Sequence, residues 1–274
     1  MTAVSIYLEM QRNLIQLPEI SAASIMPSRW LALAEIPRMV FAIASLPANL
    51  SKLTKASRST GRPVLVIPGF GTTDRSTFVL RTYLGWLGYR VYGWGMGRNL
   101  GAKTIGLHNE RLIKRLDDVY RQSGQQVTLV GWSMGGIMAR MISRVRPDQV
   151  ELIVTLGAPF SGNPFANSAW KLYERLSGHS LSHPLARAQI AESKLPPPVP
   201  SVSLFSKSDG VVAWQSCLEP DHSHTLNIEV KSAHCGFGFS PHVLQIVAER
   251  LARPFDGKIS RDRKINAARC HSIT

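Results

Sequence analysis

The chain has 274 residues, 44% of them hydrophobic, which is enough for one large domain or two small ones with a sizeable core. Charged residues make up 18%, and this excludes a highly charged disordered chain. Lysine and arginine outnumber aspartate and glutamate by 32 to 18, giving a net charge of +14. A net charge of this sign favours binding to an anionic lipid surface or a nucleic acid. The alternative is a basic surface that is only solvated. We favour the basic surface and expect no nucleic-acid partner, because no nucleic-acid-binding motif accompanies these residues.

Residues 1–60 are expected to form a helical N-terminal extension punctuated by prolines. No secretory signal is recognised at its start and no apolar run reaches ~18 residues, so we expect a cytoplasmic protein without a spanning helix. The most apolar stretch, Trp30–Leu50, is interrupted by Pro37 and by the charged residues Glu35 and Arg38. We interpret it as a helical segment that either packs on the domain, which we favour, or makes a peripheral contact with a membrane.

Residues 61–253 alternate between short apolar runs and amphipathic helical patterns. The expected strands are 63–67, 89–94, 126–130, 150–156, 202–205 and 226–230, and the expected helices are 74–87, 106–122, 134–145 and 241–251. This alternation predicts an α/β fold, with a mainly parallel sheet of about six strands and helices on both faces. Residues 157–198 form a longer excursion with two expected helices, and residues 254–274 form a basic C-terminal tail.

The strongest functional signal is Gly131-Trp132-Ser133-Met134-Gly135, which matches the pattern Gly-x-Ser-x-Gly. It follows an apolar strand and opens a helix, and in that context the pattern predicts a nucleophilic serine. The neighbours must be small because the serine lies on a sharp strand-to-helix turn with a strained backbone. We therefore expect the hydroxyl of Ser133 to project above the carboxyl-terminal edge of the sheet.

A serine hydroxyl is a weak nucleophile, so it needs a base and a group that orients the base. Asp209 follows the fifth expected strand, and His234 follows the sixth. Along the chain the three residues follow the order Ser, Asp, His, which is the order found on this kind of sheet. We predict that Ser133, Asp209 and His234 form a catalytic triad. We expect no metal and no organic cofactor, because the remaining histidines show no metal-binding pattern.

Two backbone N–H groups are expected to bind the negative oxygen that develops during acyl transfer. Met134, directly after the nucleophile, supplies one of them. Phe70, in the loop Pro68–Gly71 after the first expected strand, supplies the other. The glycines of that loop allow the backbone to turn an N–H group toward the serine. Together the two groups predict an oxyanion hole.

These features together resemble the α/β-hydrolase superfamily, in particular its bacterial lipase- and esterase-like members. The resemblance covers about residues 63–252 and rests on the Pro68–Gly71 loop, the Ser133 turn, Leu156–Phe160, and the Asp209 and His234 loops. Two features depart from the family pattern: Pro68 stands where many lipases have histidine, and the sheet begins at what would be the family's third strand. The resemblance implies an α/β-hydrolase fold with a helical N-terminal extension and a helical cap formed by residues 157–198.

The implied function is hydrolysis of carboxylic esters through an acyl-enzyme on Ser133, with a small-molecule or lipid ester as substrate. Amide or lactone hydrolysis and acyl transfer share the acyl-enzyme chemistry, so they stay open as alternatives. A non-catalytic ligand-binding protein or scaffold is a weaker alternative, because such a protein does not need an intact triad. The oligomeric state is left open.

Four aromatic residues near the motifs are expected to line the substrate site: Trp132, Phe160, Trp214 and Phe237. A few cap residues that face the serine would complete an apolar pocket for an acyl chain.

Cys217 and Cys235 lie on the segments that carry the expected acid and base, so they could come within bonding distance of each other. The alternative is two buried thiols in a reducing cytoplasm, and the sequence leaves both open. Cys270, in the tail, is expected to be free in either case.

Overall fold

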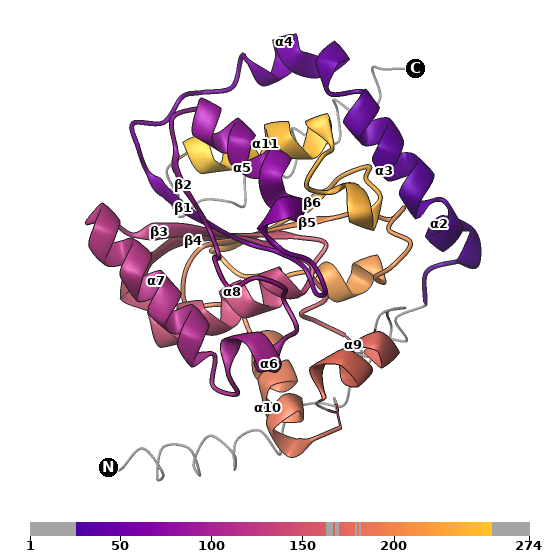
Figure 1. The fold of residues 1–274 in the computed structure, drawn as a ribbon, viewed down its shortest axis with the longest axis vertical. Coiled ribbons are helices and arrows are strands. Elements are labelled where there is room, and N and C mark those ends of the chain that lie inside the picture. The colour runs from indigo at the N-terminus through magenta and orange to yellow at the C-terminus, as the bar shows by residue number, and fades with distance from the viewer. Residues whose placement is uncertain (1–25, 163–166, 168–169, 179, 181, 254–274) are drawn as a thin grey trace.

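The computed structural model describes residues 26–162, 167, 170–178, 180 and 182–253. The first 25 residues of the expected N-terminal extension and the whole basic tail, including Cys270, lie outside these ranges. In the described part of the chain a parallel sheet lies between two layers of helices, as Figure 1 shows.

Six parallel strands form the sheet, in the spatial order β2–β1–β3–β4–β5–β6. Their bounds are β1 Pro63–Ile67, β2 Arg90–Gly93, β3 Val127–Trp132, β4 Val150–Leu156, β5 Ser201–Phe205 and β6 Thr225–Glu229. Every strand lies within two residues of its expected range, so the predicted α/β fold is confirmed. The chain crosses from β2 to β3 over β1, and ligands of such sheets bind where the strand order reverses, at the carboxyl ends of the strands.

Helices cover both faces of the sheet (Figure 1). α5 (Phe78–Trp86) and α11 (Pro241–Ala252) pack on one face, and α7 (Glu110–Ser123) and α8 (Met134–Val145) pack on the other. The strands bury alternate side chains toward the two layers because successive residues of a strand point to opposite faces. In β1, for example, Val64 and Val66 join the first apolar cluster, whereas Leu65 and Ile67 join the second.

Two of the expected helices begin differently from the sequence pattern. The helix expected from residue 106 begins at Glu110, because Asn109 has a left-handed φ of 61° and a separate short helix, α6 (Ala102–Ile105), precedes it. The helix expected from residue 74 begins as a 3₁₀ turn, η2 (Asp74–Thr77). The described residues contain further 3₁₀ turns, among them η1 (Pro47–Asn49), η3 (Pro147–Gln149) and η4 (Trp214–Cys217).

The described part of the N-terminal extension contains α2 (Arg29–Leu33), α3 (Glu35–Ala44) and α4 (Leu50–Leu53), and α2 and α3 run along one edge of the molecule (Figure 1). One side of α3 packs on η5 (His234–Gly236) and buries Glu35. The opposite side is open, and the side chains of Trp30 and Phe41 are 82% and 74% exposed. The segment therefore packs on the domain, as favoured, and also presents an uncovered apolar side.

The excursion after β4 contains the two expected helices, α9 (Trp170–Ser177) and α10 (Pro184–Ser193). They lie beyond the carboxyl-terminal edge of the sheet, and α10 contacts α8 (Figure 1). No helix in the described ranges is long and apolar enough to cross a membrane.

Candidate active site

Ser133 lies on the sharp turn between β3 and α8. Its φ of 53° and ψ of −122° place it in a region that residues with a side chain rarely adopt, at a cost of about 1–3 kcal/mol. Tight backbone packing enforces the turn. A Cβ atom at Gly131 would lie 2.4 Å from the carbonyl oxygen of Gly135, and one at Gly135 would lie 2.3 Å from that of Ile67. The two glycines of the motif are needed because no side chain fits at either position.

Asp209 and His234 meet at the same edge of the sheet. Asp209 follows β5, and His234 begins η5 after β6. Oδ2 of Asp209 lies 2.7 Å from Nδ1 of His234, and both side chains are buried. The N–H groups of Val211 and Val212 each donate to Oδ1 of Asp209 at 2.8 Å. These two bonds fix the carboxylate so that its other oxygen faces the imidazole.

The surroundings of His234 raise the pKa of its imidazole above the ordinary value. Burial, the largest influence, lowers this pKa, but the charge of Asp209, its hydrogen bond and the charge of Glu35 together outweigh burial. Because Nδ1 is held by a carboxylate, Nε2 is the ring nitrogen left to exchange a proton with a substrate. The pair is therefore arranged as a general base and its orienting group.

Two contacts bring the His234 loop to the ends of the neighbouring strands. The indole N–H of Trp132, the residue before Ser133, donates to the carbonyl oxygen of His234 at 3.1 Å. A Cβ atom at Gly157, which follows β4, would lie 3.3 Å from both Oδ2 of Asp209 and Nδ1 of His234. The structure thus gathers the three predicted triad residues at one edge. The Asp209–His234 bond is formed, whereas the Ser133 hydroxyl makes no hydrogen bond within the described residues.

The loop Pro68–Gly71 lies directly beside the nucleophile. A Cβ atom at Gly69 would lie 3.4 Å from the Cβ of Ser133. The expected oxyanion donors, the N–H groups of Phe70 and Met134, therefore come from the two segments that flank this contact. Neither group donates a hydrogen bond to another described residue.

Asn99 holds this loop on both sides of Phe70. Its side chain is fully buried, and the side-chain amide donates to the carbonyl oxygen of Pro68 at 2.8 Å. Its backbone carbonyl accepts a hydrogen bond from the N–H of Gly71 at 2.7 Å. Because Pro68 and Gly71 are both tied to Asn99, the backbone around Phe70 has little freedom to move.

Replacing Asn99 with alanine is expected to lower kcat about ten- to a hundredfold, because a small displacement of a catalytic donor has an effect of this size. KM should change much less. Steady-state kinetics with a soluble ester, alongside the melting temperature, measures the effect. The matched control is Asn49→Ala, because the side-chain amide of Asn49 donates to the carbonyl of Ser45 in the N-terminal extension. A folded Asn99→Ala protein with the wild-type kcat would contradict the role given to this residue.

A cavity of about 170 Å³ adjoins Ser133 and is lined mainly by apolar side chains. Its walls come from the Pro68–Gly71 loop, α6, α8 and the cap helices, and include Phe70, Ile105, Met134, Ile137, Met141, Phe160, Trp170, Tyr173, Ile190, Val211 and Val212. The rings of Phe70 and Tyr173 meet edge to face, with centroids 5.2 Å apart, so the loop that carries a donor also contacts the cap. An apolar cavity beside a nucleophile suits an acyl chain.

Of the four aromatic residues predicted to line the substrate site, the structure places Phe160 in the cavity wall and the other three elsewhere. Trp132 is buried, and its indole holds the His234 loop. Trp214 stacks on Phe205 in a separate apolar cluster. Phe237 is fully buried against the imidazole of His234. A substrate contact of these three residues therefore stays a prediction, and nearness in sequence to a motif does not decide which way a side chain points.

Cys217 and Cys235 are free thiols. Burial, followed by the charge of Asp209, raises the pKa of Cys217 well above its usual value. Burial, followed by the charge of Glu35, raises the pKa of Cys235 to about 11. The sequence left open either a disulfide between Cys217 and Cys235 or two thiols, and the structure contains two thiols. Both are protonated at neutral pH and therefore weakly reactive.

Sequence reasoning missed two residues of this site, Asn99 and Glu35. Asn99 belongs to no motif and lies in a loop, so its sequence context gives no signal. Glu35 offered one: it is the sole acid between residues 26 and 62 and lies in an apolar helix. A carboxylate in that position must be either solvated or hydrogen-bonded inside the protein.

A protein-family model described as "PGAP1-like alpha/beta domain" matches residues 98–226, which include Ser133 and Asp209. Two curated relatives are lipases. A triacylglycerol lipase of Burkholderia plantarii is 27% identical over 132 residues, covering 46% of this chain and 36% of that protein. Lipase B of Pseudozyma antarctica is 24% identical over 199 residues, covering 66% of this chain and 56% of that protein. The chain thus spans about a third to just over half the length of these relatives.

Solved structures show the same fold at low sequence identity. Aspergillus fumigatus lipase B superimposes with a TM-score of 0.57 at 17% identity, over 73% of this chain and 55% of that one. The Bacillus licheniformis lipase BlEst2 superimposes with a TM-score of 0.50 at 16% identity, over 72% of this chain and 94% of that one. At these identities the likeness establishes the fold.

Proposed function

We propose that this chain, which has the fold of lipases and is similar to them in sequence, hydrolyses carboxylic esters through an acyl-enzyme formed on Ser133. The observation that carries this proposal is the Asp209–His234 hydrogen bond, at the sheet edge that also bears the strained Ser133. A base oriented by a carboxylate, beside a serine exposed on a tight turn, is the arrangement that activates a hydroxyl for acyl transfer.

In the proposed mechanism, Nε2 of His234 takes the proton of Ser133 while the serine oxygen attacks the ester carbonyl carbon. Asp209 keeps Nδ1 protonated and stabilises the imidazolium that forms. The N–H groups of Phe70 and Met134 bind the oxyanion of the tetrahedral intermediate. His234 then gives its proton to the leaving alcohol. A water molecule, deprotonated by the same imidazole, hydrolyses the acyl-enzyme and restores Ser133.

The cavity supports an apolar acyl group as the part of the substrate that the protein recognises. Its lining is mainly aliphatic and aromatic, and none of the described residues that line it has an acidic or basic side chain. An ester with a hydrocarbon acyl chain therefore buries that chain without leaving a charge unpaired. Curated relatives are named lipases, which adds lipid esters to the proposed substrates.

A substrate panel tests the proposal: p-nitrophenyl esters of increasing acyl length, emulsified triglycerides, amides and lactones. We expect ester hydrolysis by the wild type, its loss in Ser133→Ala, and labelling of Ser133 by a fluorophosphonate probe, located by mass spectrometry. Ser123→Ala, at the far end of α7, is the matched control and should keep full activity. If the wild type neither hydrolyses esters nor is labelled at Ser133, the proposal is refuted. If it hydrolyses amides or lactones faster than esters, the proposed substrate class changes from esters to amides or lactones.

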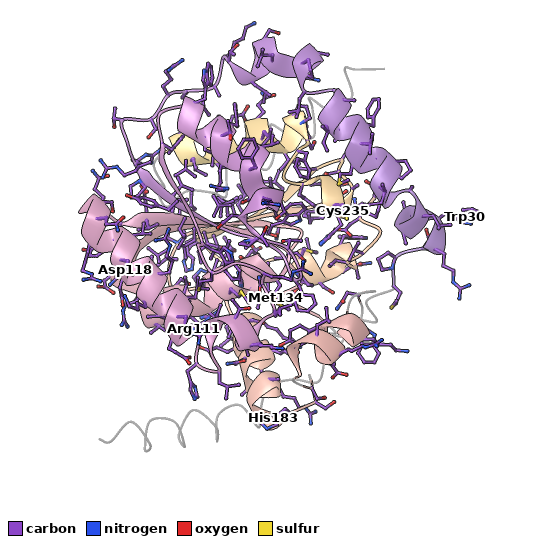
Figure 2. All side chains as sticks on the ribbon, viewed as in Figure 1. Trp30, Arg111, Asp118, Met134, His183 and Cys235 are labelled. Carbon is purple, nitrogen blue, oxygen red and sulfur yellow. The ribbon has the colours of Figure 1, made fainter. Side chains whose placement is uncertain are left out.

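We also propose that the outer side of α2 and α3 rests on an anionic lipid surface, so that the protein acts at a membrane as a peripheral enzyme. Figure 2 shows Trp30 projecting from the edge of the molecule, and Leu33 and Phe41 are 71% and 74% exposed. Basic side chains flank this side, and the exposed ones in residues 26–62 include Arg29, Lys52, Lys55 and Arg58. An apolar helical side flanked by cations is typical of interfacial binding. The cytoplasmic location expected from the sequence stays a prediction.

Vesicle flotation tests this lipid contact. We expect the wild type to float with vesicles containing phosphatidylglycerol and much less with phosphatidylcholine alone, and Trp30→Ser/Phe41→Ser to stay in solution. Phe78→Ser, which removes an exposed aromatic ring from α5, is the matched control. Point variants are needed because removal of the whole extension also removes Glu35. Equal flotation of the double variant and the wild type would argue against the lipid contact.

A further inference from the structure

Glu35 is a buried carboxylate at the start of α3, with 4% of its surface exposed. Its Oε1 accepts hydrogen bonds from the N–H of Gly210 at 2.8 Å and the N–H of His234 at 3.0 Å. Its Oε2 accepts one from the N–H of Cys235 at 2.8 Å. A carboxylate is costly to bury unless its oxygens are hydrogen-bonded, and charge-assisted bonds of this kind are stronger than neutral ones. The three N–H groups supply that compensation.

These N–H groups belong to the two loops that carry the acid and the base. Gly210 directly follows Asp209, and His234 is itself a member of the hydrogen-bonded pair. One side chain from the N-terminal extension therefore holds the backbones on both sides of the 2.7 Å contact between the carboxylate and the imidazole.

The sheet itself does not reach this contact. The last backbone bond between the β5 and β6 segments in the described chain runs from the N–H of Val230 to the carbonyl of Phe205. Beyond it, the hydroxyl of Ser206 donates to the carbonyl of Ser232 at 2.7 Å. The hydroxyl of Ser208 donates to the same carbonyl at 3.3 Å. Glu35 bonds the backbone further out, at Gly210, His234 and Cys235.

The extension also contacts the acid loop through its backbone and through Arg38. A Cβ atom at Gly210 would lie 2.4 Å from the carbonyl oxygen of Leu31, so the two backbones pack without space for a side chain. Arg38 pairs with Oε1 of Glu35 at 3.2 Å and also donates to the carbonyl of Ser208. The docked helix is thus fitted to this loop at several points.

We propose that Glu35 is a positioning residue for the Asp209–His234 pair: its carboxylate holds the acid and base loops in the relative position that keeps their hydrogen bond formed. This inference rests on the proposed ester hydrolysis and adds to it a fourth side chain, supplied from outside the hydrolase core. Glu35 does not touch the substrate, and it acts through the backbone of the two loops.

The charge of Glu35 has a second, separable effect. The charges of Asp209 and Glu35 both influence the pKa of His234. Arg38, on α3, forms an ion pair with Glu35. Cys235 is protonated at neutral pH and adds no charge. Both anions raise the pKa of His234, so removal of the charge of Glu35 lowers that pKa. Since the base must be neutral to accept a proton, kcat/KM declines as pH falls through this pKa. A lower pKa therefore moves the acidic limb of the profile to lower pH.

The test uses the full chain with Glu35→Gln. A glutamine amide keeps the shape but replaces one acceptor oxygen by an N–H₂ group, which faces one of the loop N–H groups. We expect kcat per labelled Ser133 to fall about ten- to a hundredfold, KM to change less than about threefold, and the acidic limb of kcat/KM to move to lower pH. Glu151→Gln, a partly exposed glutamate on β4 that pairs with Arg62, is the matched control and should match the wild type.

Glu35→Asp is the second variant, and it keeps the test decisive if the first does not fold. It retains the charge but withdraws the carboxylate by one methylene, so kcat per labelled site should fall while the acidic limb stays close to that of the wild type. A lower melting temperature with unchanged kcat per site and an unchanged pH profile in the folded variants would overturn the proposal. An unlabelled, inactive wild type would instead refute the proposed function, so the two failures are distinguishable.

Discussion

Asp209→Asn is expected to lower kcat about 10⁴-fold and to leave the fold intact. The asparagine carbonyl can still accept the N–H groups of Val211 and Val212, which now bond Oδ1 of the aspartate. Its N–H₂ group would then face Nδ1 of His234 and make that nitrogen an acceptor. The ring proton would move to Nε2, where it prevents the base from accepting the proton of Ser133. Steady-state kinetics with a soluble ester measures the loss.

Two controls accompany this variant. Asp148→Asn changes an exposed aspartate at the opposite edge of the sheet and should leave kcat unchanged. Fluorophosphonate labelling of Ser133 should slow in parallel with kcat in Asp209→Asn, because the probe depends on the same activated hydroxyl. A kcat within tenfold of the wild type would mean that another group orients His234.

Arg140→Met is the single substitution with the largest expected effect on stability. Arg140, on α8, and its partner Glu219 are completely buried and form an ion pair. The guanidinium also donates to the carbonyls of Ser193 and Leu195 at 3.1 and 2.7 Å and lies over the ring of Phe160. Burial lowers the pKa of Arg140 to about 10, so the side chain stays charged at neutral pH. Removing it leaves a buried carboxylate unpaired, at a cost of about 3–5 kcal/mol.

Denaturant unfolding measures this cost. The double variant Arg140→Met/Glu219→Leu should regain part of the lost stability, because it contains no unpaired buried charge. It should not regain all of it, since the two cap carbonyls still lose their donor. Arg121→Met removes an exposed pair on α7 and should change the free energy of unfolding by less than about 1 kcal/mol. If Arg140→Met also changes the free energy of unfolding by less than about 1 kcal/mol, the buried ion pair contributes little to stability.

The elements of the fold and the common location of the three candidate triad residues could be predicted because they follow local rules. Each strand is a short apolar run that the surrounding layers bury, as Val64–Ile67 illustrates with all four residues fully buried. Ser133, Asp209 and His234 each follow a strand of one parallel sheet, so the topology alone brings them to the same edge. Reading strand ends from the sequence was therefore enough to group them.

The supporting residues could not be predicted, because they act across long distances in the sequence. Asn99 contacts a carbonyl 31 positions away, and Glu35 contacts amides more than 170 positions away. The backbone of Trp132 ends strand β3 close to where the sequence predicts, but its indole points toward the His234 carbonyl rather than the cavity. Side-chain direction depends on which segment packs against which, and this is fixed by the tertiary fold rather than by any local pattern.

The distance along the chain between Glu35 and its partners has a consequence for biosynthesis. The helix that carries this glutamate is synthesised 200 residues before Cys235. At about 5–20 residues per second, the interval is about 10–40 s. During that time the carboxylate has none of its three amide partners, and the side of α3 that packs on η5 has no partner. The backbone of the His234 loop is thus completed only when it meets a helix that was synthesised 200 residues earlier.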